Sequence, residues 1–339
     1  MRDGAGNQRD PERGFGGVKA GSRRGGAETR RTQLPVLVLG AGALGFAIRL
    51  LYLRQIWHAP FFNLRFGDAE SYHLWARRIA DGDWLGSGVF YQAPLYPYFL
   101  ACIYRVLGDS PGTVRIVQAL MGGVACGLLA WTGARLWGRR GVLAGVLLAI
   151  YAPGIFLDGV LEKSALVTLL FAALLAVVAA ADVDWRAWLA VGATLGLLSL
   201  ARENALLLLL PLAAWCVWGA RARWIGAAAL VAGCALMLLP VATRNLAIGG
   251  EFVLTTSQFG PNFYIGNHAG ADGTYQALVE GHGSAADERD DATRIAEQSA
   301  GRKLSAGEVS SYWTSRALEF VRSQPASWLA LLGRKFALT

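Results

Sequence analysis

Charged side chains are scarce in this chain of 339 residues. Only 17% of the residues are charged, 54% are hydrophobic and the mean hydropathy is positive, whereas a soluble domain of this length would carry more charge. The apolar residues form unbroken runs of about 17 to 20 residues, which match the thickness of a bilayer core. Backbone polar groups in lipid must pair internally, so these runs predict membrane-spanning helices.

Cysteine is sparse as well, and its placement excludes two classes of site. The four cysteines, Cys102, Cys126, Cys216 and Cys234, lie in apolar segments without CxxC spacing. This pattern is typical neither of a disulfide framework nor of a zinc site. Each thiol is therefore predicted to be a small buried hydrophobic group.

The net charge of +8 is distributed in a way that indicates membrane topology. Eight basic residues fall within the first 31 positions, and most of the others flank apolar runs. No basic stripe is interleaved with aromatic residues, so nucleic acid is not predicted as a partner. Because basic residues prefer the cytoplasmic side of a membrane, the N-terminus is predicted to be cytoplasmic.

The apolar runs predict an all-α, polytopic transmembrane bundle. Residues 1–33, which are rich in Gly and Arg, are predicted to form a disordered cytoplasmic tail. The predicted spans cover about 34–53, 112–134, 141–157, 164–181, 187–201, 204–220 and 224–243. A polar segment at 244–306, an amphipathic helix at about 307–322 and a last apolar run from Ala326 follow.

The apolar piece 94–107 decides the topology. It has only 14 residues, with Pro94 and Pro97 near its start, which is short for a span. If it does not span, the Arg-rich connections later in the chain face the cytoplasm, as the positive-inside rule favours. It is therefore predicted to be an interfacial helix within an outer loop at 54–111, and a second outer loop covers 244–325.

A glycine motif in the first span suggests a nucleotide site, which the rest of the chain argues against. Residues 40–45 read Gly-Ala-Gly-Ala-Leu-Gly, a GxGxxG pattern, and Asp68 follows at a distance suited to a ribose contact. A dinucleotide-binding fold needs alternating strands and amphipathic helices, and nothing downstream supplies them. The small residues are instead predicted to allow close helix packing in the membrane.

The first outer loop places acidic and aromatic residues close together. Asp68 and Glu70 begin a predicted helix, and Tyr72 lies one turn beyond Asp68 on the same face. Taken alone, Asp68 fits the capping of free amides at a helix start better than it fits catalysis.

Other polar residues on the same predicted side favour a catalytic role. Glu162 lies in one outer turn, the run 202–204 reads Arg-Glu-Asn in another, and Arg244-Asn245 ends the last full span. Arginine is disfavoured on the outer side, so such pairs there indicate a functional site. Arginines can bind an anionic lipid headgroup bidentately, and a carboxylate can take a proton from an attacking hydroxyl.

In their order and spacing, these segments resemble a known family. The chain looks like the GT-C membrane glycosyltransferases of the protein O-mannosyltransferase and aminoarabinose-transferase type (glycosyltransferase family 39). The resemblance runs from about residue 34 to the end and is carried by residues 67–72, 82–84, 93–97, 202–204, 240–245 and 264–267.

The resemblance implies a sugar donor linked to polyprenyl phosphate and a single inverting displacement onto an acceptor hydroxyl. Asp68 would be the catalytic base, and Arg202 and Arg244 would bind the donor phosphate. Glu70 and Glu162 are further acid candidates. The side chains expected to contact substrate are Tyr72, His73, Gln92, Tyr96, Asn245, Tyr264 and Asn267.

Two residues depart from the family pattern. Glu70 stands two positions after Asp68 instead of next to it, and Gln92 occupies a place where the aminoarabinose transferase has Glu. No cofactor follows from the sequence, and a divalent cation beside these acids is left open. Family members usually continue with more spans, so residues 34–339 are expected to be a GT-C module that is incomplete at its C-terminus.

The expected setting is the inner membrane of a bacterium, with the active site facing the periplasm. The acceptor, a protein, lipid or glycan, is left open. A transporter or flippase of lipid-linked intermediates is the competing function, and it would place charge at mid-membrane or show repeats with broken helices. The predicted spans are almost free of such charge. A degenerate family member with a structural role is the third interpretation.

Overall fold

A computed structural model describes residues 22–63, 65, 67–181, 184–219 and 223–338, with only the backbone described at 22–32 and 61. Over these residues the chain is helical and contains no strand, which confirms the predicted all-α fold class. Most of the predicted disordered tail, residues 1–21, lies outside the described part.

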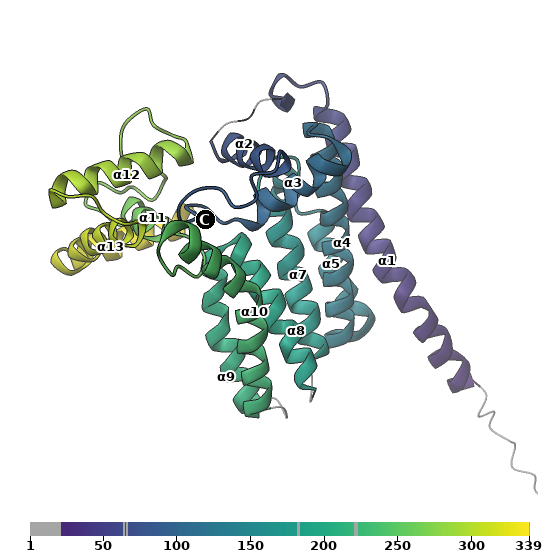
Figure 1. The fold of residues 1–339 in the computed structure, drawn as a ribbon. Coiled ribbons are helices and arrows are strands. Elements are labelled where there is room, and N and C mark those ends of the chain that lie inside the picture. Colours follow the sequence, from purple (N-terminus) through teal and green to yellow (C-terminus); the bar gives the residue numbers. More distant parts are fainter. Residues whose placement is uncertain (1–21, 64, 66, 182–183, 220–222, 339) are drawn as a thin grey trace, which may run out of the picture.

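The bundle consists of helices that run side by side (Figure 1). They are α1 (Ser22–Ile56), α4 (Pro111–Trp137), α5 (Leu143–Ala149), α6 (Ala152–Asp158), α7 (Ser164–Ala180), α8 (Trp185–Ala201), α9 (Leu209–Gly219) and α10 (Arg223–Gly249). By length and composition, the described helical stretches 33–56, 111–149 and 223–249 could each cross a membrane. Many large apolar side chains on the bundle surface are exposed, as lipid-facing residues are.

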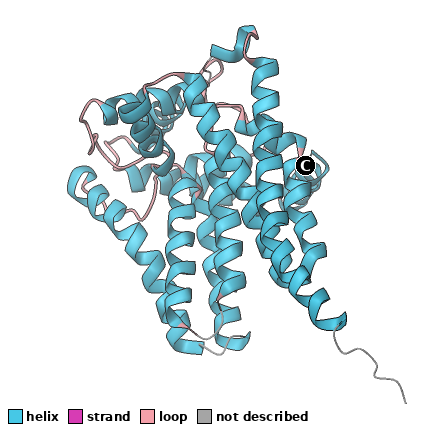
Figure 2. Ribbon diagram, turned by 90° about the vertical axis from the view of Figure 1, so that its right-hand side faces the viewer, coloured by secondary structure: helices cyan, strands magenta, loops and turns pink. Residues whose placement is uncertain are grey.

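The two ends of the bundle differ. One end, here named the capped end, carries α2 (Asp68–Ala80), α3 (Leu95–Leu107), α11 (Phe259–Gly266), α12 (Ala285–Ala300) and α13 (Ala306–Ser323), as Figures 1 and 2 show. The opposite end, here named the basic end, holds the connections with Arg139, Arg140, Arg186 and Arg223. Short 3-10 segments at Pro60–Asn63, Gly138–Val142 and Glu203–Leu208, and α14 (Pro325–Leu338), complete the described elements.

Helix α3 lies at the capped end and does not run along the bundle, as the interfacial prediction for 94–107 requires (Figure 1). It packs against α2 through buried apolar side chains, among them Tyr72 and Ile79 of α2 and Tyr96 and Leu100 of α3. Each helix has only 13 residues, which at ~1.5 Å per residue is too short to cross a bilayer core. The α2–α3 pair therefore covers one end of the bundle.

The structure adds three details to the predicted layout. Helix α1 begins at Ser22 and contains the predicted span 34–53, so the predicted disorder was wrong for 22–33, where Ala, Glu, Gln and Arg residues favour helix. The predicted span 141–157 is divided into α5 and α6, because Pro153 cannot continue a helix but suits the first turn of a new one. The polar segment 244–306 contains α11 and α12.

Close packing of α1 on α4 explains the glycine motif of the first span. A Cβ added at Gly42 would lie 3.2 Å from the carbonyl oxygen of Gly123, so both positions suit glycine. This geometry supports the interpretation of 40–45 as a helix-packing motif. Of the four cysteines, Cys102 is exposed, so its prediction as a buried group was wrong, while Cys126, Cys216 and Cys234 are buried.

A buried ion pair joins α1 to the end of α6, and the sequence did not predict it. Arg49 Nε donates to Asp158 Oδ2 at 2.5 Å, and the two residues are 1% and 3% exposed. Arg49 Nη1 also donates to the Gly45 carbonyl at 3.1 Å. A Cβ on Gly122 of α4 would overlap both charged groups, so the glycine leaves room for the pair. The pair thus connects three helices inside the bundle.

Removing one partner of this pair should destabilise the fold more than removing both. Either Arg49→Met or Asp158→Leu leaves a buried charge without its partner, which costs about 3–5 kcal/mol. We expect the double variant to recover most of that loss in unfolding experiments in detergent micelles, followed by circular dichroism. A double variant no more stable than the single variants would contradict this account.

Candidate functional site

Asp68 is the first residue of α2, and its side chain is not a helix cap. The N-cap is Gly67, whose positive φ of 56° favours glycine. Among the described residues, the Asp68 carboxylate accepts one hydrogen bond, from Gln92 Nε2 at 2.9 Å. The start of a helix favours a negative charge, and Gln92 fixes the direction of the carboxylate. The capping alternative therefore does not describe this side chain.

Three carboxylates from different parts of the chain act on Tyr72 of α2. Burial raises the pKa of the Tyr72 hydroxyl, and the charges of Asp68, Glu162 and Glu203 raise it further. Tyr72 is fully buried, its ring packs edge-on against Tyr96, and its hydroxyl has no hydrogen-bond partner among the described residues. The three carboxylates, here named the acid cluster, thus all lie close enough to Tyr72 for their charges to affect its pKa.

Glu162 is the member of the acid cluster whose titration is most strongly altered. Burial raises the pKa of Glu162 to about 7, with a further contribution from the negative charge of Asp68. Lys163, the next residue, opposes this shift. Like charges and burial both disfavour the ionised form, so Glu162 exchanges its proton near neutral pH.

Glu203 and Arg202 are adjacent in sequence but differ in their contacts. Glu203 accepts hydrogen bonds from Thr256 Oγ1 at 3.0 Å and from Gln258 Nε2 at 2.6 Å, which fixes the carboxylate. Arg202 follows α8 with an extended backbone, is exposed, and has no side-chain partner among the described residues. Its guanidinium is therefore available to bind an anion.

Arg244 and Asn245, at the end of α10, bind the chain's own loops. The Arg244 guanidinium donates to the carbonyls of Leu85 and Gly88 and lies 3.8 Å from the Phe90 ring centroid. The buried Asn245 Oδ1 accepts from the Phe90 N–H at 3.2 Å and from Arg244. These contacts leave Arg244 fewer free donors for a phosphate than Arg202 has.

The Asn245 amide also donates twice. Its Nδ2 donates to the carbonyls of Val253 and Thr255 at 2.9 and 3.1 Å. With two bonds accepted and two donated, the side chain has used its full hydrogen-bonding capacity. The predicted substrate contact by Asn245 therefore has no free donor or acceptor to support it.

The other predicted residues fall into two places. Gln92 and Tyr72 lie with Asp68. The Tyr96 hydroxyl donates to Gln118 Oε1 at 2.6 Å, and Gln118 Nε2 in turn donates to the carbonyls of the 158–160 turn. The negative charge of Glu70 acts to raise the pKa of His73 and of Tyr104. These two side chains are joined by a 2.9 Å hydrogen bond on another side of α2. Glu70 and His73 are thus separate from the acid cluster.

Tyr264 belongs to a small core with Trp313 of α13, and Asn267 contacts α14. The Tyr264 ring lies 4.6 Å from the Trp313 ring, and Asn267 Oδ1 accepts from Trp328 Nε1 at 3.0 Å. The structure places neither side chain in contact with the acid cluster. Their described contacts are those of packing residues.

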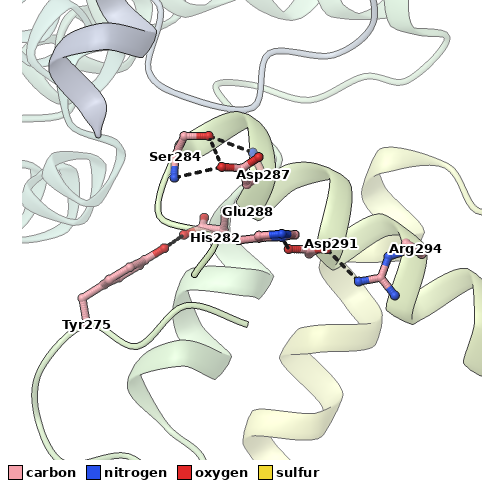
Figure 3. A network of polar contacts seen from close by, with 7 residues as sticks. All are labelled: Tyr275, His282, Ser284, Asp287, Glu288, Asp291 and Arg294. Atoms are coloured by element: carbon pink, nitrogen blue, oxygen red, sulfur yellow. Dashed lines mark hydrogen bonds and ion pairs between the residues drawn. The ribbon is translucent and has the colours of Figure 1, made fainter. Parts of the chain in front are cut away.

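A polar network on α12, which the sequence did not predict, holds this helix against the loops (Figure 3). Buried Glu288 accepts from Tyr275 at 2.9 Å and from Tyr91, the neighbour of Gln92, at 2.6 Å. Asp291 pairs with His282 and Arg294 at 2.5 and 2.7 Å. The capping box of Ser284 and Asp287 was the sequence signal for this helix.

No group of three or more His, Cys, Asp or Glu residues in the described ranges is arranged to hold a metal ion.

Comparison with known proteins gives one match, over the central part of the chain. Residues 91–246 match the family model of dolichyl-phosphate-mannose-protein mannosyltransferases. Searches among curated proteins and among solved structures gave no match. The predicted resemblance is confirmed over the matched residues, and the family implies a membrane glycosyltransferase of the GT-C type. The match includes Glu162, Arg202 and Arg244, while Asp68 precedes it.

Replacing Asn245 should loosen the two loops that it joins. Asn245→Leu keeps the volume but leaves the Phe90 N–H and two carbonyls without their partners, at about 1–3 kcal/mol for each buried unpaired group. We expect faster amide hydrogen exchange at 82–90 and 250–258. Asn262→Leu, on an exposed position of α11, is the control. Unchanged exchange in both loops would argue against the joining role.

The raised pKa of Glu162 predicts a pH-dependent stability. The pKa lies above the ordinary value of 4.5, so the protonated form stabilises the fold and that contribution is lost as pH rises through about 7. Glu162→Gln, which stays neutral, should melt at a higher temperature than wild type above pH 7, with the gap closing toward pH 5.

A second variant tests the physical cause. Asp68→Asn removes the neighbouring negative charge and should move the transition of Glu162 to lower pH. Melting in detergent from pH 5 to 8.5 measures both effects. Parallel melting curves for wild type and Glu162→Gln at every pH would refute the shifted pKa.

Proposed function

We propose that the chain transfers a sugar from a polyprenyl-phosphate donor to an acceptor hydroxyl, with Asp68 as the general base. The observation that carries the proposal is the Asp68 carboxylate, which is free of helix capping, oriented by Gln92 and grouped with Glu162 and Glu203. The family match to residues 91–246 supports the reaction class.

The reaction is a single displacement. The acceptor oxygen attacks the anomeric carbon and forms the new C–O bond, while its proton passes to Asp68. The bond from the anomeric carbon to the phosphate oxygen breaks, and the electron pair leaves with polyprenyl phosphate. Attack opposite the leaving group inverts the anomeric configuration.

Arg202 is the better candidate for the leaving phosphate. It is exposed beside the acid cluster, whereas the guanidinium of Arg244 is held by loop carbonyls. Positive charge that faces the developing phosphate anion lowers the barrier. Glu162 assists by being partly protonated near pH 7, because a neutral carboxyl repels the anionic donor less than a carboxylate.

The charge distribution supports an orientation with the capped end outside. The basic end collects Arg139, Arg140, Arg186 and Arg223, and basic connections prefer the cytoplasm. The acid cluster lies at the capped end, so in this orientation the reaction takes place on the outer face. In a bacterial inner membrane that face is the periplasmic one.

Transport of lipid-linked intermediates is the second candidate, and one observation favours it. Arg49 and Asp158 form a charged pair within the bundle, and transporters often carry such pairs. Both charges are compensated and closely packed against Gly122, which is typical of a structural pair.

A transfer assay tests the proposed function. Asp68→Asn should lower the transfer of radiolabelled sugar from polyprenyl-phosphate donors in membranes by about 10²–10⁴-fold, the usual contribution of a general base. Glu70→Gln, two positions along α2 and outside the acid cluster, is the matched control. Equal transfer by wild type and Asp68→Asn, or movement of the intact donor across the membrane without transfer, would contradict the proposal.

A further inference from the structure

A cavity of about 240 Å³ lies at the capped end, next to the acid cluster. Its walls come from α2, from the loop at 83–92 and from the start of α12. Ser71, Trp75 and Arg78 of α2 line it, as do Tyr91 and Gln92 of the loop. This cavity, here named the α2–α12 cavity, is large enough for a sugar ring with a substituent.

Positive charge dominates its lining. Arg78, Arg289 and Arg244 contribute three guanidinium groups, against the single carboxylate of Asp83. Asp83 already accepts a hydrogen bond from the Gly86 N–H at 2.9 Å, and Arg244 is held by loop carbonyls. A positive surplus with little internal pairing favours an anionic ligand.

Two of the three arginines have free donors. The guanidinium groups of Arg78 and Arg289 have no hydrogen-bond or ion-pair partner among the described residues. They come from different helices, α2 and α12, and line the same cavity. A Cβ on Gly88 would lie 3.2 Å from Arg289 Nη2, so this arginine lies against the loop. A phosphate or carboxylate between them would receive charge-assisted hydrogen bonds from both sides.

Aromatic rings supply a second feature of the cavity. Trp75 and Phe90 lie 5.3 Å apart between ring centroids, and both line it. An aromatic wall beside cationic groups suits a ligand that has an apolar face and a negative charge. A sugar ring that carries a phosphate or carboxylate combines these two properties.

The cavity is coupled to the catalytic base through Gln92. This residue lines the cavity and donates to Asp68 Oδ1, and Ser71, another lining residue, stands three positions after Asp68. A ligand in the cavity can therefore present a hydroxyl toward the base. The donor is the weaker candidate, because its phosphate is carried by a membrane lipid, while α12 of the outer layer closes this cavity.

We propose that the α2–α12 cavity binds the acceptor, and that the acceptor is a glycan carrying a phosphate or carboxylate held by Arg78 and Arg289. The assignment as an acceptor site rests on the proposed glycosyl transfer. The binding of an anionic sugar rests on the cavity alone, so the two claims can fail separately.

Chemical protection of arginine tests the site without an activity assay. Phenylglyoxal modifies accessible guanidinium groups, and mass spectrometry reads each position in the full chain in detergent. Mannose 6-phosphate and glucuronate should slow the modification of Arg78 and Arg289, whereas neutral mannose should not. Arg77, the neighbour of Arg78, pairs with Asp109 at 3.8 Å outside the cavity and should react equally with and without ligand.

Two variants sharpen the test. Arg289→Gln should raise the concentration of mannose 6-phosphate that half-protects Arg78 by about tenfold, the effect of losing one charge-assisted contact. Arg77→Gln, the matched control, should leave it unchanged. Absence of protection, or equal protection by neutral mannose, would overturn the anionic-sugar site.

Two further experiments distinguish binding of the acceptor from binding of the donor, and test the acceptor site independently of the catalytic base. Protection by polyprenyl phosphate in phosphatidylcholine vesicles, but by neither soluble anionic sugar, would overturn the acceptor assignment in favour of the donor. Asp68→Asn should keep the protection while losing transfer. If Asp68→Asn loses transfer and wild type shows no protection, only the acceptor site is wrong. If protection holds while Asp68→Asn still transfers, the cavity is supported and the catalytic base is wrong.

Discussion

Three hydrogen bonds of one buried amide, Asn245, connect the two loops of the capped end on which the candidate site depends. The amide accepts from the Phe90 N–H and donates to the Val253 and Thr255 carbonyls, and thereby connects the loop that precedes α3 to the loop that follows α10. Ser257 adds a backbone bond to the Phe90 carbonyl at 3.0 Å. Gln92 follows two residues after Phe90, and Gln258 follows Ser257, so the same connection positions the partners of Asp68 and Glu203.

This arrangement explains why charged residues at the capped end serve different purposes. Arg244, next to Asn245, donates to loop carbonyls and so helps to hold the loop in place. Arg202 at the end of α8 has no such contacts in the described chain. The acids differ in the same way. Glu203 is held by two donors, whereas Glu162 is half-buried and its pKa is raised by burial and by the charge of Asp68. The contacts of each charged side chain, more than its residue type, therefore distinguish the residues that hold the loops from those that are available to a substrate.

The bundle could be predicted from the sequence because a span is a local property: a long apolar run has few other structures available in lipid. Asp68 could not be singled out from its local sequence, which fits a helix cap better, and needed the polar residues on the same predicted side and the family resemblance. The role of Arg244 could not be predicted, because the carbonyls of Leu85 and Gly88 that occupy it carry no sequence signal. Glu288 was missed because its partner Tyr91 stands 197 positions away. Tyr264 and Asn267, which the resemblance implied as substrate contacts, instead contact Trp313 of α13 and Trp328 of α14.

Gln92 marks the boundary between two electrostatic surroundings of opposite sign. It donates to Asp68, whose charge acts on Tyr72 together with those of Glu162 and Glu203, and it lines the cavity that contains Arg78 and Arg289. An anionic sugar would be attracted to the arginines and repelled by the acids, so its charge would orient it with the anionic group away from Asp68. A hydroxyl on the far side of the ring would then be nearest the base. In the proposed reaction, this separation of charge would select which end of the acceptor reacts, without any contact to the reacting carbon.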